Sequence, residues 1–368
     1  MNEPSVLDYL KSLFRRGKRL AIAPKQDKQI LSKSAPKKAS QPVKKGTPRN
    51  PQFERPSVLL IVIALLALVI TLAFIVMLNF DESHIVPIVA WLIALVAYVA
   101  AFGYRFSDLL KWLRAFLSRN RSILLPLGLL TLATTLLRFW NLDSIPFVLS
   151  GDEAAQGLEA IRVISGDIRN PFTTGWTGVP TMTFYLISLP IRLFGATVFG
   201  LRFAAAFIGV LTIPIVFFLT RRLINQSVAW LSAGLLAVYH YHIHFSRLGS
   251  NMILDPFFAA LSLLFLHRAL SPRAKKADWI LVGFLPGLSL YFYTGARFVV
   301  VLVLAMLAYF LLVERREFFS KHGRGLLIAL GAFIIASGPM LQLALRFPDI
   351  FNSRINQIGI LQNGWLET

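Results

Sequence analysis

The chain of 368 residues contains no cysteine, so it has no disulfide, no thiolate metal ligand and no thiol nucleophile. Acidic residues are also scarce: 18 Asp and Glu stand against 38 Lys and Arg, which gives a formal net charge of +20. Charged residues make up only 15% of the chain, whereas hydrophobic residues make up 56%. Soluble domains are about 45–50% apolar. The shortage of charge therefore indicates a protein that is solvated largely by lipid.

Long apolar runs without charge recur from residue 58 onward. The first, 58–79, crosses a hydrocarbon core of about 30 Å if it is an α-helix, which rises about 1.5 Å per residue. It is too long for the apolar part of a cleaved signal peptide. Comparable runs lie at 85–104, 122–141, 201–219, 228–245, 253–270, 278–295, 297–313 and 325–345, with a less regular one at 179–196. The sequence predicts an all-α polytopic transmembrane bundle with about nine or ten membrane segments.

The basic charge is concentrated at the N-terminus. Residues 1–57 hold fourteen Lys and Arg against four Asp and Glu, with Pro, Ser, Gln and Gly between them, a composition typical of disorder. Such a tail attracts anionic lipids, or serves only to keep this end in the cytoplasm; both interpretations stay open. No folded module or interleaved aromatic residue accompanies the charge, so we expect no nucleic-acid partner.

The composition predicts three parts of the chain. Residues 1–57 are expected to form a disordered basic cytoplasmic tail. Residues 58–121 are expected to add two N-terminal transmembrane helices and a cytoplasmic amphipathic segment, 106–118. Residues 122–368 are expected to form the transmembrane core, which includes a second amphipathic helix at 153–165.

Loop charge predicts how the chain is threaded. The loops 105–121, 220–227, 267–277 and 314–324 carry five, two, four and four Lys or Arg, and the loops between them carry none or one. The positive-inside rule therefore places the basic loops in the cytoplasm and residue 152 outside the plasma (inner) membrane. Three apolar runs then separate two external loops, although their number should be even. We expect 179–196, which contains Pro180, Pro190 and Arg192, to lie in the outer interface; the alternative is that all three cross.

This threading brings acids and arginines to the outer face. Burying carboxylates beside lipid is costly, so adjacent acids there indicate chemistry or ion binding. A carboxylate accepts the proton of an attacking hydroxyl, and guanidinium groups hold a phosphate. The catalytic candidates are Asp152, Glu153 and Asp255, and the candidates for binding a donor phosphate are Arg297, Arg202, Arg247 and Arg138.

Several of these residues also have a purely structural interpretation. Asp255 is a plausible helix N-cap, Glu153 suits the first turn of a helix, and Arg138 and Arg202 could snorkel at helix ends. His240 and His244 have the i,i+4 spacing of a metal pair, but an interfacial aromatic belt explains this segment better. The sequence neither requires nor excludes a divalent cation.

Five motifs in this order resemble a known family. They are Leu137-Arg138-Phe139-Trp140-Asn141-Leu142, Gly151-Asp152-Glu153-Ala154, Val179-Pro180 with Phe184-Tyr185-Leu186, Phe199-Gly200-Leu201-Arg202-Phe203, and Phe245-Ser246-Arg247 with Leu254-Asp255-Pro256-Phe257. The order resembles that of integral-membrane glycosyltransferases related to dolichyl-phosphate-mannose–protein mannosyltransferases and to lipid A aminoarabinose transferases. The resemblance covers about residues 122–368.

The resemblance implies a polyprenyl-phosphate sugar donor and inverting transfer on the outer face. It makes Asp152 the counterpart of the catalytic acid, Glu153 its neighbour and Asp255 the second external acid. Arg202 corresponds to the family's arginine at the start of a helix, and Arg297 resembles a residue that contacts the donor phosphate. Aromatic residues of the same segments are expected to line the substrate pocket: Tyr185, Tyr291 and Tyr293. Family members usually continue with more helices and a soluble domain, so the core is expected to be short or incomplete.

Two other functions fit the composition. A transporter or lipid flippase would use Asp152 and Asp255 as proton or ion sites, although such charges usually lie near the bilayer midplane in repeated halves. A non-catalytic assembly protein would use its tail to dock on lipid or on a partner. Neither the sugar nor the acceptor, whether protein, lipid or glycan, follows from the sequence.

Overall fold

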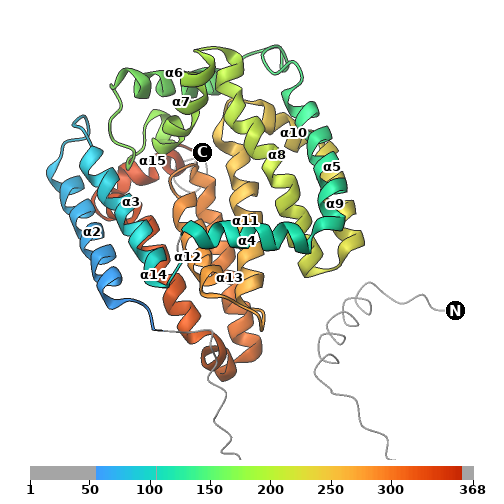
Figure 1. The fold of residues 1–368 in the computed structure, drawn as a ribbon. Helices are drawn as coiled ribbons and strands as arrows, with labels where there is room; N and C mark the ends of the chain where they lie inside the picture. Colours follow the sequence, from blue (N-terminus) through green and yellow to red (C-terminus); the bar gives the residue numbers. More distant parts are fainter. Residues whose placement is uncertain (1–54, 105, 359–368) are drawn as a thin grey trace, which may run out of the picture. The chain divides into compact units, whose positions relative to one another are not determined.

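The computed structural model describes residues 55–104 and 106–358 (Figure 1). The predictions about the basic tail therefore lie almost entirely outside the described residues. The described residues belong to one compact unit, Asn50–Thr368. Their regular structure consists of α-helices with three short 3₁₀ turns and no strand, so the prediction of an all-α bundle is confirmed.

Six helices in the described part of the chain are long and apolar enough to cross a membrane. They are α2 (Val58–Met77), α5 (Arg121–Phe139), α8 (Val198–Leu223), α11 (Leu254–Ala269, extended by the preceding turn), α13 (Arg297–Glu314) and α14 (Arg316–Arg346). Three shorter apolar helices accompany them: α3 (Ile85–Ala101), α7 (Met182–Phe194) and α9 (Gln226–Val238). The protein is thus a multi-pass helical membrane protein, and each predicted apolar run contains a helix.

Helix α12 (Lys276–Ser289) packs along α11 and α14 inside the bundle. The remaining helices lie at the ends of the long ones. They are α4 (Phe106–Arg119), α6 (Gly151–Ser165), α10 (His240–Arg247) and α15 (Pro348–Ile358), with 3₁₀ turns η1 (Trp176–Gly178), η2 (Asn251–Ile253) and η3 (Thr294–Ala296). The two amphipathic segments of the sequence form α4 and α6, as predicted. Helices α6, α7 and α15 share one end of the bundle, at the top of Figure 1, which we call the α6 face. Helix α4 runs crosswise near the other end of α5, on the α4 face.

The predicted run 228–245 is not one continuous helix. It breaks at Tyr239, whose extended backbone separates α9 from α10. The reason is visible in α10: Arg247 and Ser246 turn inward to polar partners, and a continuous apolar span would not place them there. The run 278–295 likewise ends its helix at Ser289.

The bundle depends on close approach of backbones. A Cβ at Gly283 of α12 would collide with the Ala329 carbonyl oxygen of α14. Helices in lipid gain little from the hydrophobic effect between them, so small residues and interhelical hydrogen bonds supply the attraction. The Trp91 indole donates to the Ile335 carbonyl at 3.0 Å, and the Tyr98 hydroxyl donates to the Ile328 carbonyl at 2.7 Å. These bonds tie the hairpin of α2 and α3 to α14.

The length of α7 favours an interfacial position. Its 13 residues extend for only about 20 Å, against a hydrocarbon core of about 30 Å. Helix α7 also packs on α6, the amphipathic helix, and on the start of α8. The predicted interfacial position of 179–196 is therefore compatible with the structure and stays a prediction.

Cysteine labelling tests this threading in a chain that has no natural cysteine. We expect Val148→Cys and Ala196→Cys, both at exposed positions on the α6 face, to react with an impermeant maleimide in intact cells. Ser320→Cys, exposed near the start of α14, is expected to react only after lysis. If Ala196→Cys behaves like Ser320→Cys while Val148→Cys is labelled, α7 crosses the membrane and the parity argument is wrong.

Candidate functional site

The N-terminus of α6 is fixed by a capping box. The Ser150 hydroxyl accepts from the Glu153 amide at 3.2 Å, and a Glu153 carboxylate oxygen accepts from the Ser150 amide at 3.4 Å. Such a box satisfies two backbone donors that the first helical turn leaves free. It fixes the start of the helix at Gly151 and so places Asp152 in the first turn.

Glu153 is buried in a dense set of hydrogen bonds. It is 0% exposed and Arg202 is 1% exposed. The guanidinium donates through Nε to Oε1 at 2.6 Å and through Nη2 to Oε2 at 3.1 Å. The Gly249 amide donates to Oε1 at 2.7 Å. A paired and fully bonded carboxylate of this kind holds α6, α8 and the 248–250 segment together.

The three arginines near the start of α6 are bound by protein groups. Besides Glu153, Arg202 donates to the carbonyls of Leu142 and Pro146, each at 3.0 Å. Arg247 donates to four backbone carbonyls in two places: the C-terminal end of α5 and the loop that follows it. They are those of Leu137, Trp140, Asn141 and Ile145.

Arg138 is buried without a carboxylate partner among the described residues. Its guanidinium donates to His242 Nδ1 at 2.8 Å, to the Ala237 carbonyl at 3.1 Å and to the Ser246 hydroxyl at 3.3 Å. Arg202 and Arg247 therefore fix the loop that leads into α6, whereas Arg138 ties α5 to the α9–α10 break. The sequence-based prediction that these three arginines bind a donor phosphate stays a prediction.

Asp152 differs from its neighbour. It lies exposed in the first turn of α6, and the described residues give it neither a hydrogen bond nor an ion pair. The positive end of the helix dipole favours a carboxylate at this point. Of the adjacent acids, one is thus used by the fold and the other is exposed without a partner among the described residues.

A second free carboxylate belongs to Asp255, in the first turn of α11. Its Oδ1 is buried and has no hydrogen-bond partner in the described part of the chain. A Cβ on Gly295 would collide with Oδ2, so glycine lets the η3 backbone lie directly against this carboxylate. The interpretation of Asp255 as an N-cap finds no support, because Ile253 occupies the cap position.

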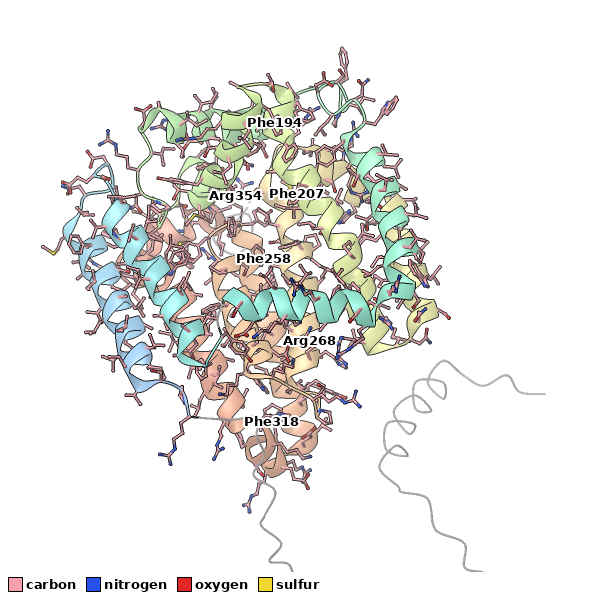
Figure 2. The ribbon with its side chains drawn as sticks, viewed as in Figure 1. Phe194, Phe207, Phe258, Arg268, Phe318 and Arg354 are labelled. Carbon is pink, nitrogen blue, oxygen red and sulfur yellow. The ribbon has the colours of Figure 1, made fainter. Side chains whose placement is uncertain are left out.

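Tyr293 interacts electrostatically with Asp255 and with Arg354. Burial raises the pKa of the Tyr293 phenol; the charge of Asp255 acts in the same direction and that of Arg354 opposes it. Arg354 comes from α15, which packs against η1, where a Cβ on Gly178 would meet the Arg354 amide. Figure 2 labels Arg354 in the upper half of the bundle, above Phe258 of α11. Asp255, Tyr293 and Arg354 form what we call the α11–α15 cluster.

Arg297 ties the start of α13 to α15. Its guanidinium donates to the Asn352 side-chain oxygen at 2.9 Å and to the Phe351 carbonyl, and it lies 3.7 Å above the centre of the Phe351 ring. Arg354, by contrast, has no hydrogen-bond or ion-pair partner within the described ranges. Sequence reasoning missed it, because nothing in the sequence shows that the helix after α14 packs against η1.

The three candidate tyrosines have different surroundings. Tyr291 is 0% exposed, donates to the Ala336 carbonyl at 2.8 Å and packs against Trp91, so it belongs to the core. Tyr185 is half-buried and donates to the Ile168 carbonyl at 3.1 Å. Tyr293 alone lies beside a free carboxylate.

A series of hydrogen bonds along residues 249–251 connects Glu153 to the backbone beside Tyr293. The Gly249 amide binds Glu153, two residues before Asn251. The Asn251 side chain donates to the Phe292 carbonyl at 2.9 Å, next to Tyr293. The α6 start and the α11–α15 cluster are therefore fixed to one framework.

The described residues hold little enclosed space for a substrate. A cavity between α7, α8 and residues 249–254 has about 10 Å³, the room of about one water molecule. Nor do three or more His, Asp or Glu side chains gather as metal ligands within 55–104 and 106–358.

Comparison with known proteins supports a specific resemblance. The family model described as dolichyl-phosphate-mannose-protein mannosyltransferase matches residues 178–341. An uncharacterized protein of Aquifex aeolicus (strain VF5) is 29% identical over 119 residues, which are 32% of this chain and 24% of that protein. An undecaprenyl phosphate-alpha-4-amino-4-deoxy-L-arabinose arabinosyl transferase of Edwardsiella ictaluri (strain 93-146) is 29% identical over 176 residues, 46% of this chain and 31% of that enzyme. No solved structure matches.

The resemblance to polyprenyl-phosphate-sugar glycosyltransferases is thus confirmed. The matched stretches span only 24% and 31% of the length of these two relatives. The family match contains Arg202, Asp255 and Arg297 and begins after Asp152.

Proposed function

We propose that the chain is a membrane glycosyltransferase of the plasma (inner) membrane. It moves a sugar from a polyprenyl-phosphate donor to an acceptor hydroxyl on the extracytoplasmic face, with inversion. The observation that carries this proposal is the division of the acidic pair: Glu153 is locked to Arg202, while the adjacent Asp152 is exposed and unpaired at a helix N-terminus. The resemblance supplies the donor class.

In the proposed reaction Asp152 is the general base. The acceptor oxygen attacks the anomeric carbon of the sugar as its proton passes to the Asp152 carboxylate. The bond from the anomeric carbon to the phosphate oxygen breaks, and polyprenyl phosphate leaves with the electron pair. A single displacement from the opposite side inverts the anomeric centre. No redox partner is required.

The leaving phosphate needs a cation, and the α11–α15 cluster offers one. We assign this role to Arg354, because Arg138, Arg202, Arg247 and Arg297 are bound by protein groups. A guanidinium that faces a phosphate stabilises the charge as it develops. Asp255 and Tyr293 beside it would orient the sugar through their oxygens.

The loop before α6 suits a lipid-linked donor. It exposes apolar side chains, among them Phe147 at 96% and Val148 at 70%. Apolar side chains at a membrane face contact acyl chains. A polyprenyl donor that diffuses in the outer leaflet would reach Asp152 along this surface.

The position of the acids also argues against transport. Asp152 and Asp255 both occupy first helical turns, at the end of a helix. Proton and ion sites of transporters lie near the bilayer midplane, often on broken helices.

Purified chain in detergent, supplied with a synthetic polyprenyl-phosphate sugar and a membrane extract as acceptor source, tests the proposal. We expect release of polyprenyl phosphate, measured by liquid chromatography with mass detection. A nucleotide-linked sugar is the matched control and is expected to give none. Turnover of the nucleotide sugar would contradict the proposed donor class. A substrate flux across proteoliposomes without release of polyprenyl phosphate would indicate a transporter instead.

Replacing Arg354 by Gln is expected to raise the KM for the donor by about tenfold or more, because a charge-assisted hydrogen bond to phosphate contributes roughly 1.5–3 kcal/mol. Arg346→Gln, which removes an exposed guanidinium at the end of α14, is the control and should leave KM unchanged. Initial rates at varied donor concentration measure both. Equal KM values for the two variants would exclude Arg354 from the donor site.

A further inference from the structure

The α4 face carries a group of arginines that the proposed reaction does not use. Arg119 ends α4, Arg221 and Arg222 lie in the last turn of α8, and Arg268 lies in the last turn of α11. Arg222 interacts electrostatically with the other three. We call these four residues the arginine cluster.

The cluster has a large excess of positive charge. The carboxylate within its electrostatic reach is that of Asp278, which is buried and binds Arg268 at 2.7 Å. Its second oxygen accepts from the Lys275 amide at 2.9 Å, so each carboxylate oxygen of Asp278 already has a partner. Four guanidinium groups therefore face one carboxylate that is already bound. Like charges held this close repel one another, and an anion from outside would relieve the repulsion.

Two arginines of the arginine cluster are hydrogen-bonded to protein side chains, and two are not. Arg221 donates to the Asn120 side-chain oxygen at 2.9 Å, and Arg268 holds Asp278. Arg119 and Arg222 are exposed, and the described residues offer neither of them a hydrogen bond or an ion pair. Their donors are available to a ligand.

Helix α4 places the cluster at the depth of lipid headgroups. Leu110, Leu113 and Leu117 are exposed and share one side of the helix by their i, i+3 and i+7 spacing. An amphipathic helix with exposed leucines lies along a membrane surface with this side among the acyl chains. Helix α4 runs crosswise to the membrane helices in Figure 1, and Phe116 packs on Phe218 of α8 at 5.2 Å between ring centres. Figure 2 labels Arg268 close to this level.

We propose that the arginine cluster binds the phosphate headgroup of an anionic phospholipid in the leaflet on the α4 face. A phosphate diester accepts several guanidinium hydrogen bonds at once. Its acyl chains would lie along the leucine side of α4. A phospholipid fits both the charge and the adjoining apolar surface, whereas a free phosphate ion fits only the charge. This site is separate from the sugar-transfer site and does not depend on its assignment.

Native mass spectrometry of the full chain tests the site, with phosphatidylglycerol and phosphatidylcholine as probes. We expect phosphatidylglycerol to bind more tightly. Arg222→Gln and Arg119→Gln, each of which removes one available cation, should weaken phosphatidylglycerol binding by about fivefold. Arg273→Gln, an exposed arginine in the loop between α11 and α12, is the control for general surface charge and should change binding by less than about twofold.

Three results would overturn the proposal. The first is equal affinity of the unmodified chain for the two lipids. The second is an equal loss in Arg222→Gln, Arg119→Gln and Arg273→Gln, which would indicate diffuse attraction to the surface. The third is complete displacement of phosphatidylglycerol by excess inorganic phosphate, which would indicate a site for a soluble anion. Unfolding temperatures in phosphatidylcholine nanodiscs identify a misfolded variant, and the two single variants provide independent tests.

Discussion

Replacing Asp152 by Asn is expected to lower turnover by about 10²–10⁴-fold, the usual contribution of a general base. Asparagine keeps the size of the side chain and the start of α6, but its amide does not take the proton of the acceptor hydroxyl. Binding of the polyprenyl-phosphate sugar should survive, because the donor phosphate is assigned to Arg354 and not to Asp152. Turnover and donor binding are measured on the same preparation in one detergent.

Asp143→Asn is the matched control for this experiment. Asp143 is an exposed acid in the loop that precedes α6, and its replacement makes the same change of charge. Its turnover should stay within about twofold of the unmodified chain, since exposed charges at a distance are screened by salt. Near-normal turnover of Asp152→Asn would exclude Asp152 from the reaction and favour the ion-site interpretation.

The second large effect concerns stability. Glu153→Gln is expected to destabilise the fold by about 3–5 kcal/mol, because it leaves the guanidinium of Arg202 buried without its counter-charge. The expected readout is a lower unfolding temperature in detergent, followed by tryptophan fluorescence. Activity should fall together with the folded fraction, in contrast to Asp152→Asn, which should unfold normally.

Two comparisons isolate the buried pair. Arg162→Gln removes the exposed ion pair with Glu159 on the same helix, at 2.8 Å, and should cost less than about 1 kcal/mol. The double variant Glu153→Met with Arg202→Met removes both charges, and should be more stable than Glu153→Gln because no buried charge is left unpaired. A double variant less stable than the single one would show that the ion pair itself contributes net stability.

The sequence predicts the helices of this protein well. A membrane-spanning segment must form its backbone hydrogen bonds internally as a helix, and such a segment is recognised by its length and its apolar composition. The prediction of one continuous helix over 228–245 is wrong at Tyr239. The apolar content of that run does not reveal that Ser246 and Arg247 have polar partners inside the bundle. The bond partners of Arg247 lie 102 to 110 residues away. Such partners cannot be read from local composition.

The candidate site shows the same division. The acidic pair, Asp255 and the aromatic segments could be selected from residue type and motif order. The distinction between Asp152 and Glu153 could not, because it depends on Arg202, 49 residues further along the chain. The role proposed for Arg354 depends on the packing of α15 against η1. Long-range pairing therefore decides which polar residues are free for chemistry.

The attachment of the first hairpin to α14 has a consequence for biogenesis. Trp91 and Tyr98 find their acceptors 244 and 230 residues later in the chain. At about 5–20 residues per second, a ribosome needs roughly 10–50 s to make that stretch. Throughout this interval α3 resides in the bilayer with an indole and a phenol that lack their final partners. Helix α3 thus enters the membrane before α14 and completes its native packing only after α14 has followed, and the translocon or a membrane chaperone has time to hold it.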